Sequence, residues 1–240
     1  MPRFLSLAFL FFGFNQVNAQ IDVDWVSRHG SYTTDRCNAV CVDGEANLFT
    51  AGIFTDTLSL NGQTHIGIGF LDGYIAKLDS NGNQIWIQLA LGPDDDQPTH
   101  LITLPNGDVV ASGNFGDSIS ISNATVHALG NDDVWLARLN GEDGAVEWLI
   151  SVGSVYAYEN VGGLVATNDA IHWAVNFGST INISTNTFTS QGFNDAAIIK
   201  LDHDGNIIST NVLSGSHNDN VLSLAADNDG NVYAGGRFNG

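Results

Sequence analysis

An internal repeat with a period of about 61 residues constrains the fold of this chain more than any other feature. Phe54, Phe115, Phe177 and Phe238 stand 61, 62 and 61 positions apart. Other residue types keep the same interval, namely Gly69, Gly130 and Gly192, then Asp72, Asp133 and Asp195, then Lys77, Arg138 and Lys200. Chance does not place so many residue types at one interval, so the sequence predicts successive copies of one supersecondary unit.

Each copy carries the local signals of β-strands. The segment 109–115, VVASGNF, follows an Asn-Gly-Asp turn, which supplies the positive φ that a tight hairpin needs. The segment 73–78, GYIAKL, is apolar on both faces apart from one basic side chain, which is typical of a strand covered on both sides. We therefore expect four main strands in each copy, with a short extra hairpin on segments such as SISISNATVHALG, and no helices.

Four recurring antiparallel strands that cannot bury both faces alone are what a β-propeller blade requires. We expect an all-β propeller with blades at 32–92, 93–153 and 154–215 and the start of another at 216–240. The segment 20–31 resembles the last strand of a blade and is expected to complete the final blade of a ring. Because a ring normally needs roughly four to eight blades, we expect an incomplete ring, either a fragment or an open arc.

The first 19 residues predict export. A lone Arg3 precedes an apolar run at 4–14, and Ala19 ends a stretch suited to cleavage before Gln20. The run is too short for a permanent membrane helix, so we expect a secreted or cell-surface protein without membrane insertion of the mature chain. With 26 acidic and 7 basic residues, the net charge of −19 repels phosphate backbones and excludes a nucleic-acid partner.

The segment 227–238, DNDGNVYAGGRF, and the order Asp, Ala-(Lys/Arg)-Leu-(Asp/Asn), Gly, Trp in the first two full copies resemble the SBBP-type β-propeller repeats. Secreted and surface proteins of bacteria, often Bacteroidetes, contain these repeats. The resemblance covers essentially the whole mature chain and implies fold and export, but no single activity. The third copy departs from it, with Ile199 in place of the Ala and Ser209 in place of the Trp.

Acidic residues recur in the loops that enter the first strand of each copy. If these loops meet at one rim of the ring, their carboxylates could hold a hard cation such as Ca²⁺. The alternative is solvated rim charge that favours solubility and discourages edge pairing. Stretches such as Asp79-Ser-Asn-Gly-Asn83 likewise fit a calcium loop or a hairpin turn. The candidate rim residues are Asp35, Asp94, Asp95, Asp96, Glu159 and Asp219.

Two further groups have alternative interpretations. Lys77, Arg138 and Lys200 either form a basic ladder for an anionic ligand or pair with Asp residues of the same or a neighbouring blade. Cys37 and Cys41, the only cysteines, would lie roughly 13 Å apart along a strand. A disulfide needs about 4.4 to 6.8 Å between Cα atoms, so we expect free thiols, with a bridge as the alternative.

The repeat contains no single chemically distinct copy, which favours a non-catalytic binding or adhesion scaffold. Its ligand would be a glycan or a protein, with no cofactor other than the calcium considered above. One alternative is a propeller enzyme, such as a quinone-dependent dehydrogenase or a polysaccharide-degrading enzyme. Another is a structural spacer within a larger surface protein.

Overall fold

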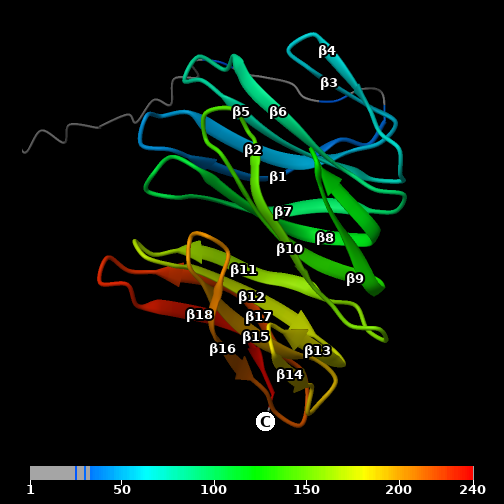
Figure 1. The fold of residues 1–240 in the computed structure, drawn as a ribbon, viewed down its shortest axis with the longest axis vertical. Helices are drawn as coiled ribbons and strands as arrows, with labels where there is room; N and C mark the ends of the chain where they lie inside the picture. The colour runs from blue at the N-terminus through cyan, green and yellow to red at the C-terminus, as the bar shows by residue number, and fades with distance from the viewer. Residues whose placement is uncertain (1–24, 26–29, 31–32, 240) are drawn as a thin grey trace, which may run out of the picture.

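The computed structural model describes residues 25, 30 and 33–239. The expected signal peptide at 1–19 lies outside the described residues, as does most of the segment 20–31. Every regular element in the described part is a β-strand, and the sheets are antiparallel (Figure 1). The all-β prediction is confirmed. No helix in this part is long and apolar enough to cross a membrane.

The strands form three units with the same order of antiparallel pairing, first to second, second to third and third to fourth. Unit 1 consists of β1 (Arg36–Val42), β2 (Leu48–Phe54), β5 (Asp72–Leu78) and β6 (Gln84–Leu91). Unit 2 consists of β7 (Asp96–Thr103), β8 (Val109–Ile121), β9 (Ala124–Leu139) and β10 (Val146–Val152). Unit 3 consists of β11 (Asn160–Ala166), β12 (Ile171–Phe177), β15 (Asp195–Leu201) and β16 (Ile207–Leu213). The hairpin of β17 (Asp219–Ala226) and β18 (Val232–Phe238) follows.

The expected extra hairpins are present between the second and third strands. In units 1 and 3 they are separate two-stranded sheets, formed by β3 (Thr57–Leu60) with β4 (Gln63–Ile66) and by β13 (Thr180–Ile183) with β14 (Asn186–Thr189). In unit 2 the hairpin is continuous with β8 and β9, across a register shift between Gly116 and Ser118. The tip of β8 also pairs with the end of β6, at Ala90–Ile121 and Leu91–Ser120, which joins units 1 and 2 into one sheet.

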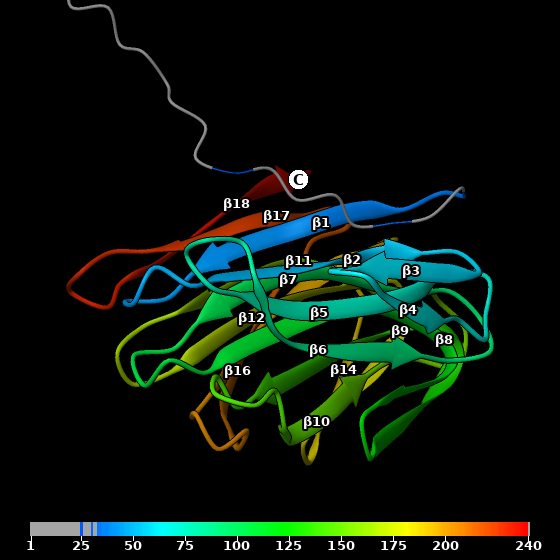
Figure 2. The ribbon, with the colours of Figure 1, turned by 90° about the horizontal axis from the view of Figure 1, so that it is seen from above.

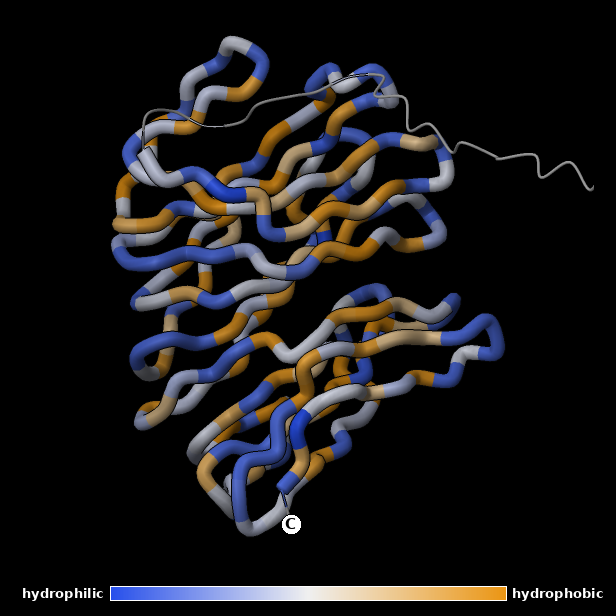
Figure 3. The backbone as a smooth tube through the Cα atoms, turned by 180° about the vertical axis from the view of Figure 1, so that it is seen from behind, coloured by the Kyte–Doolittle hydropathy of each residue, from blue (hydrophilic) through white to orange (hydrophobic). Residues whose placement is uncertain are grey.

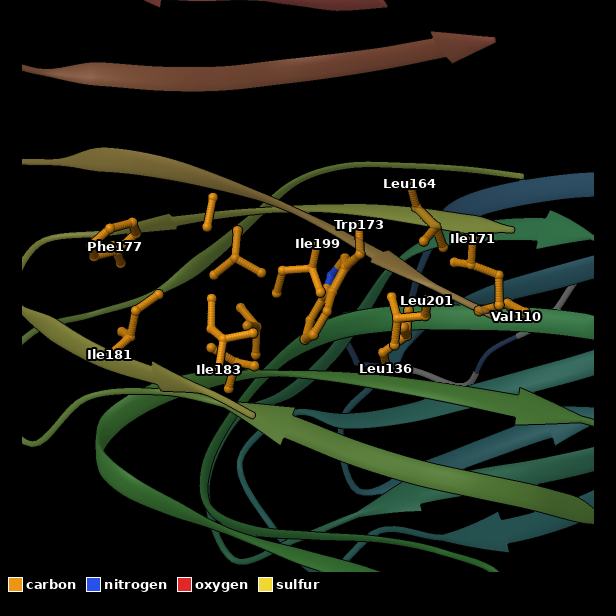
Figure 4. Close-up of a cluster of buried hydrophobic side chains, with 14 of the residues drawn as sticks. Val110, Leu136, Leu164, Ile171, Trp173, Phe177, Ile181, Ile183, Ile199 and Leu201 are labelled. Atoms are coloured by element: carbon orange, nitrogen blue, oxygen red, sulfur yellow. The ribbon is translucent and has the colours of Figure 1, made fainter. Parts of the chain in front are cut away.

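The two largest apolar cores lie between successive units, and a smaller one lies within unit 1. One core packs Phe49 and Ile75 of unit 1 against Val109 and Trp135 of unit 2. The next packs Val110 and Leu136 of unit 2 against side chains of unit 3, among which Figure 4 shows Trp173 and Ile199. Figure 3 shows hydrophobic segments along the strands and hydrophilic segments at many of the turns. The sheets of units 1 and 2 therefore cover each other, and so do those of units 2 and 3.

The first strands of successive units lie beside each other, β1 by β7, β7 by β11 and β11 by β17. They are not hydrogen-bonded as a sheet, and Figure 2 shows β1 and β17 on the same side of the molecule. A backbone hydrogen bond recurs at each junction, where an N–H at or just before the start of a first strand donates to a carbonyl of the previous unit. These bonds are Asp96 to Leu71, Glu159 to Asp132 and Asp219 to Asn194, at 2.7, 3.0 and 2.7 Å.

Neighbouring units are also joined by a contact that we call the tryptophan clamp. The Trp86 indole N–H of unit 1 donates to the carbonyl of Gly141 in unit 2 at 3.2 Å, and Trp148 of unit 2 donates to His203 in unit 3 at 3.0 Å. Each ring lies against a turn glycine with positive φ, Gly144 or Gly205, where a Cβ atom would meet ring carbons at 2.8 or 2.9 Å. These glycines are required both for their φ and for the close approach of the ring.

Trp25, one of the two described residues of the expected orphan strand, makes the same contact with unit 1. Its indole N–H donates to the Ser80 carbonyl at 2.9 Å, and its ring covers Gly82. In unit 3, Ser209 stands opposite Lys200 where the other units have Trp. The tryptophan clamp is therefore observed at three successive turns.

Candidate functional site: the turn groove and the acidic junction

Two of the three basic residues at the shared repeat position, Lys77 and Arg138, form structural contacts. Lys77 Nζ lies 3.1 Å from Asp43 Oδ2 and donates to the same Gly141 carbonyl as Trp86, at 2.8 Å. Arg138 contacts Asp108 Oδ2 at 2.6 Å and donates to the His203 carbonyl at 2.8 Å. For Lys77 and Arg138, the interpretation as pairs with Asp is confirmed.

The Asp-rich turns bond their own backbone. Asp79 Oδ1 accepts the N–H groups of Asn81 and Asn83, both at 2.8 Å, while Oδ2 accepts the Asn83 side-chain amide at 2.8 Å. Asp202 and Asp227 make the same set of bonds in their turns. Hydrogen bonds from Asn83 lower the pKa of Asp79. The turn interpretation is confirmed, because the carboxylates serve to close the hairpins.

A groove of about 760 Å³, which we call the turn groove, lies where the turns of the three units meet. The β1–β2, β7–β8 and β11–β12 turns project to the same side, on the left of Figure 1. Its lining is mostly polar and includes five acidic and two basic side chains. These are Asp43, Glu45, Asp108, Glu142 and Glu147, with Lys77 and Arg138.

Only some of the charged side chains in the turn groove form ion pairs. Both basic side chains are paired with Asp43 and Asp108, as described above. Among the described residues, no ion pair reaches Glu45, Glu142 or Glu147, and all three are exposed. Burial alone would raise the pKa of Asp43, but hydrogen bonds from Asn47, followed by that from Lys77, lower this pKa to about 2. The groove is therefore anionic at neutral pH.

The predicted rim residues are placed differently from either expectation. Asp96, Glu159 and Asp219 are 0%, 1% and 5% exposed; Asp96 and Asp219 begin β7 and β17, and Glu159 immediately precedes β11. They lie at separate junctions between units, so they are neither solvated charge nor one cluster. Asp35 and Asp95 are half-buried and Asp94 is exposed. No group of three or more His, Cys, Asp or Glu in the described part is arranged to hold a metal ion.

Buried acids interact in pairs at two of the junctions, Asp72 with Asp96 and Asp133 with Glu159. Asp72 and Asp195 begin β5 and β15, whereas Asp133 lies within β9. All three are almost fully buried and accept N–H groups from residues three or four positions earlier in the chain. Burial and then the neighbouring Asp72 raise the pKa of Asp96 to about 9. Burial also raises the pKa of Glu159 to about 7, although the Ser154 hydroxyl and N–H oppose this. Sequence reasoning missed the partner acids as site residues, although their repeat position was visible.

The junction between units 1 and 2 carries the most charge. Asp94, Asp95 and Asp96 are consecutive, and burial followed by the charges of Asp95 and Asp94 raises the pKa of Asp132. We call the set Asp72, Asp94, Asp95, Asp96 and Asp132 the acidic junction. The sequence contained a signal for the burial of two of the predicted acids. Gly92 and Gly215 stand four residues before Asp96 and Asp219. A Cβ atom there would lie only 2.5 or 2.6 Å from a carboxylate oxygen.

The cysteines are both free. Cys37 is exposed and its Sγ lies 3.2 Å from the Thr50 hydroxyl. Burial, followed by the charge of Asp43, raises the pKa of the Cys41 thiol to about 12. Cys41 is therefore a protonated, unreactive thiol at neutral pH.

The comparisons with known proteins find no match, neither to a family model nor to a curated protein. The resemblance to the SBBP-type repeats therefore stays a prediction.

Proposed function

We propose that this protein is an exported, non-catalytic β-propeller of the SBBP type that binds an extracellular protein through the turn groove. Three observations support the architecture. The pairing order recurs in units 1, 2 and 3, the cores lie between units, and the first strands adjoin in order. Stacking of four-stranded sheets through their faces, with first strands toward a common axis, is the arrangement of propeller blades.

The turn groove carries the proposal of binding, because three units contribute turns to one polar hollow. Propellers and other repeat proteins present loops from several repeats on one face, where a ligand contacts many of them at once. The unpaired Glu45, Glu142 and Glu147 favour a ligand with positive charge. A basic segment of a partner protein fits this chemistry better than a neutral glycan.

A direct test titrates the purified protein with an octalysine peptide and, separately, with an octaglutamate peptide. Calorimetry at low and at physiological salt should show binding of octalysine only, weakening as salt rises. The variant Glu45→Gln/Glu142→Gln/Glu147→Gln should bind octalysine at least tenfold more weakly.

The matched control removes three exposed acids outside the groove, as Asp56→Asn/Asp117→Asn/Asp229→Asn. Both triple variants change the net charge equally, so only a groove-specific site separates them. Equal weakening in both would refute a localised site and leave only a general attraction to an acidic protein. Export is tested by the N-terminus of the protein recovered from the medium, expected at Gln20.

A further inference from the structure

The acidic junction contains buried carboxylates without compensating donors. Asp96 is fully buried, and neither of its carboxylate oxygens has a hydrogen-bond partner among the described residues. Asp72 is also fully buried, and its Oδ2 accepts the N–H groups of Ile68 and Gly69 at 2.9 and 3.1 Å, while its Oδ1 has no partner in the same part of the chain. A buried ionised carboxylate is strongly unfavourable unless it is paired, coordinates a metal or takes up a proton. Asp96 must therefore either share a proton with a neighbouring carboxylate or contact a cation.

The equivalent positions at the other two junctions differ in this respect. Glu159 accepts the Ser154 N–H at 2.9 Å and the Ser154 hydroxyl at 2.8 Å. Asp219 accepts the Asn239 N–H at 2.9 Å. The described residues thus supply donors to Glu159, just before β11, and to Asp219, which begins β17, but none to Asp96, which begins β7. The junction between units 1 and 2 is chemically distinct within the repeat.

The surroundings of Asp96 offer oxygen atoms. The loop before β7 packs on Gly69, whose N–H donates to Asp72, and the carbonyl oxygens of Gly92 and Asp94 lie closest to where a Cβ atom of Gly69 would be. The Ser118 carbonyl oxygen and Asp96 Oδ2 approach Gly92 in the same way. Asp94, Asp95 and Asp132 add negative charge around this point. Carboxylates together with backbone carbonyls are the ligands that hard cations prefer.

We propose that the acidic junction binds Ca²⁺ through Asp96 and Asp72, with backbone carbonyl oxygens of the adjoining loop and water completing the coordination. Two carboxylates are fewer than a high-affinity site uses, which places the affinity in the range of about 10⁻⁴ to 10⁻³ M seen in extracellular modules. Mg²⁺ demands octahedral geometry and keeps its water, so it should bind more weakly. The cation would join units 1 and 2 at the edge opposite the hairpin turns.

The test uses the purified protein after treatment with a chelator. Calorimetric titration with CaCl₂ should show one site per chain, and 10 mM CaCl₂ should raise the melting temperature by several degrees. Asp96→Asn and Asp72→Asn should each abolish that rise.

The matched control is Asp219→Asn, at the equivalent strand start with its own protein donor, which should keep the calcium response. No calcium binding to the wild type would overturn the proposal. A calcium response that persists in both Asp96→Asn and Asp72→Asn would overturn it too, since the ion then binds elsewhere. Acid stabilisation of the chelator-treated protein, with no effect of calcium, would assign the junction to a shared proton instead.

Discussion

The tryptophan clamp predicts that two glycines with the same backbone conformation differ sharply in their tolerance of alanine. Gly144 has a φ of 77°, and a Cβ atom there would lie 2.8 Å from Trp86 Cδ2. Gly107 has a φ of 89°, also in a hairpin turn, and a Cβ atom there would meet nothing within 4 Å. The pair separates the cost of backbone strain from the cost of losing the clamp.

The expected magnitudes follow from these distances. An alanine in the left-handed region costs about 1 to 2 kcal/mol, partly offset by a less flexible unfolded chain. Gly107→Ala should therefore lower the free energy of unfolding by about 1 kcal/mol. Carbon atoms pack best at about 3.5 to 4.0 Å, so Gly144→Ala must displace the indole as well. Such overpacking costs about 1 to 3 kcal/mol more, for a total of about 2 to 4 kcal/mol.

Urea unfolding followed by tryptophan fluorescence and circular dichroism measures the difference. At this chain length, 1 kcal/mol corresponds to about 2 to 4 °C in melting temperature, so calorimetry should separate the variants by several degrees. In a Trp86→Leu background the total cost of Gly144→Ala should fall to that of Gly107→Ala. A double-mutant cycle would report the lost difference as the coupling energy between Trp86 and Gly144. If both alanine variants lose equal stability with the tryptophan in place, the clamp does not tie unit 1 to unit 2.

Three other outcomes are expected. First, the pKa of Glu159 is raised, so its contribution to stability is fully present below about pH 4 and is lost as the pH rises to about 7; the slope is at most about 1.4 kcal/mol per pH unit. Glu159→Gln should flatten urea midpoints across this window, and an unchanged slope would contradict the assignment. Second, Arg138→Met leaves Asp108, whose side chain is 9% exposed, without its cation and should cost about 3 kcal/mol. Arg138→Lys should cost about 1 kcal/mol, and equal costs in chemical denaturation would show that the forked contact is unimportant. Third, iodoacetamide at pH 8 should label Cys37 and spare Cys41 until the protein is denatured, as intact mass would show. Labelling of neither thiol before reduction would indicate a bridge.

The strands could be predicted because each copy repeats its local signals. The Asn-Gly-Asp turn before β8 and the doubly covered β5, buried along its whole length, follow from residue pattern alone. The pairing of β6 with the tip of β8 could not be predicted, because it depends on how far the unit 2 hairpin extends. That extension rests on the register shift after Gly116, which a pattern of alternating residues does not reveal.

The candidate site was predicted in its residues but not in their environment. Asp96, Glu159 and Asp219 were correctly assigned to one repeat position, yet a polar residue next to a loop is normally solvated, and these three are buried. Burial results from contact between two units, which spacing along one chain does not report. The glycines at 92 and 215 were the available signal, because a side chain there would overlap the carboxylate.

Lys77 and Arg138 bond the same carbonyl oxygens as Trp86 and Trp148, and these contacts determine which ligands suit the turn groove. Each side chain divides its hydrogen bonds between an Asp of its own unit and a carbonyl of the next. An anionic ligand would have to displace Asp43 or Asp108 and break the contact between units. A cationic ligand meets Glu45, Glu142 and Glu147 instead, which form none of these contacts between units. Substituting these three glutamates should therefore weaken binding while leaving the melting temperature within about 2 °C of the wild type, whereas Arg138→Met should lower the melting temperature.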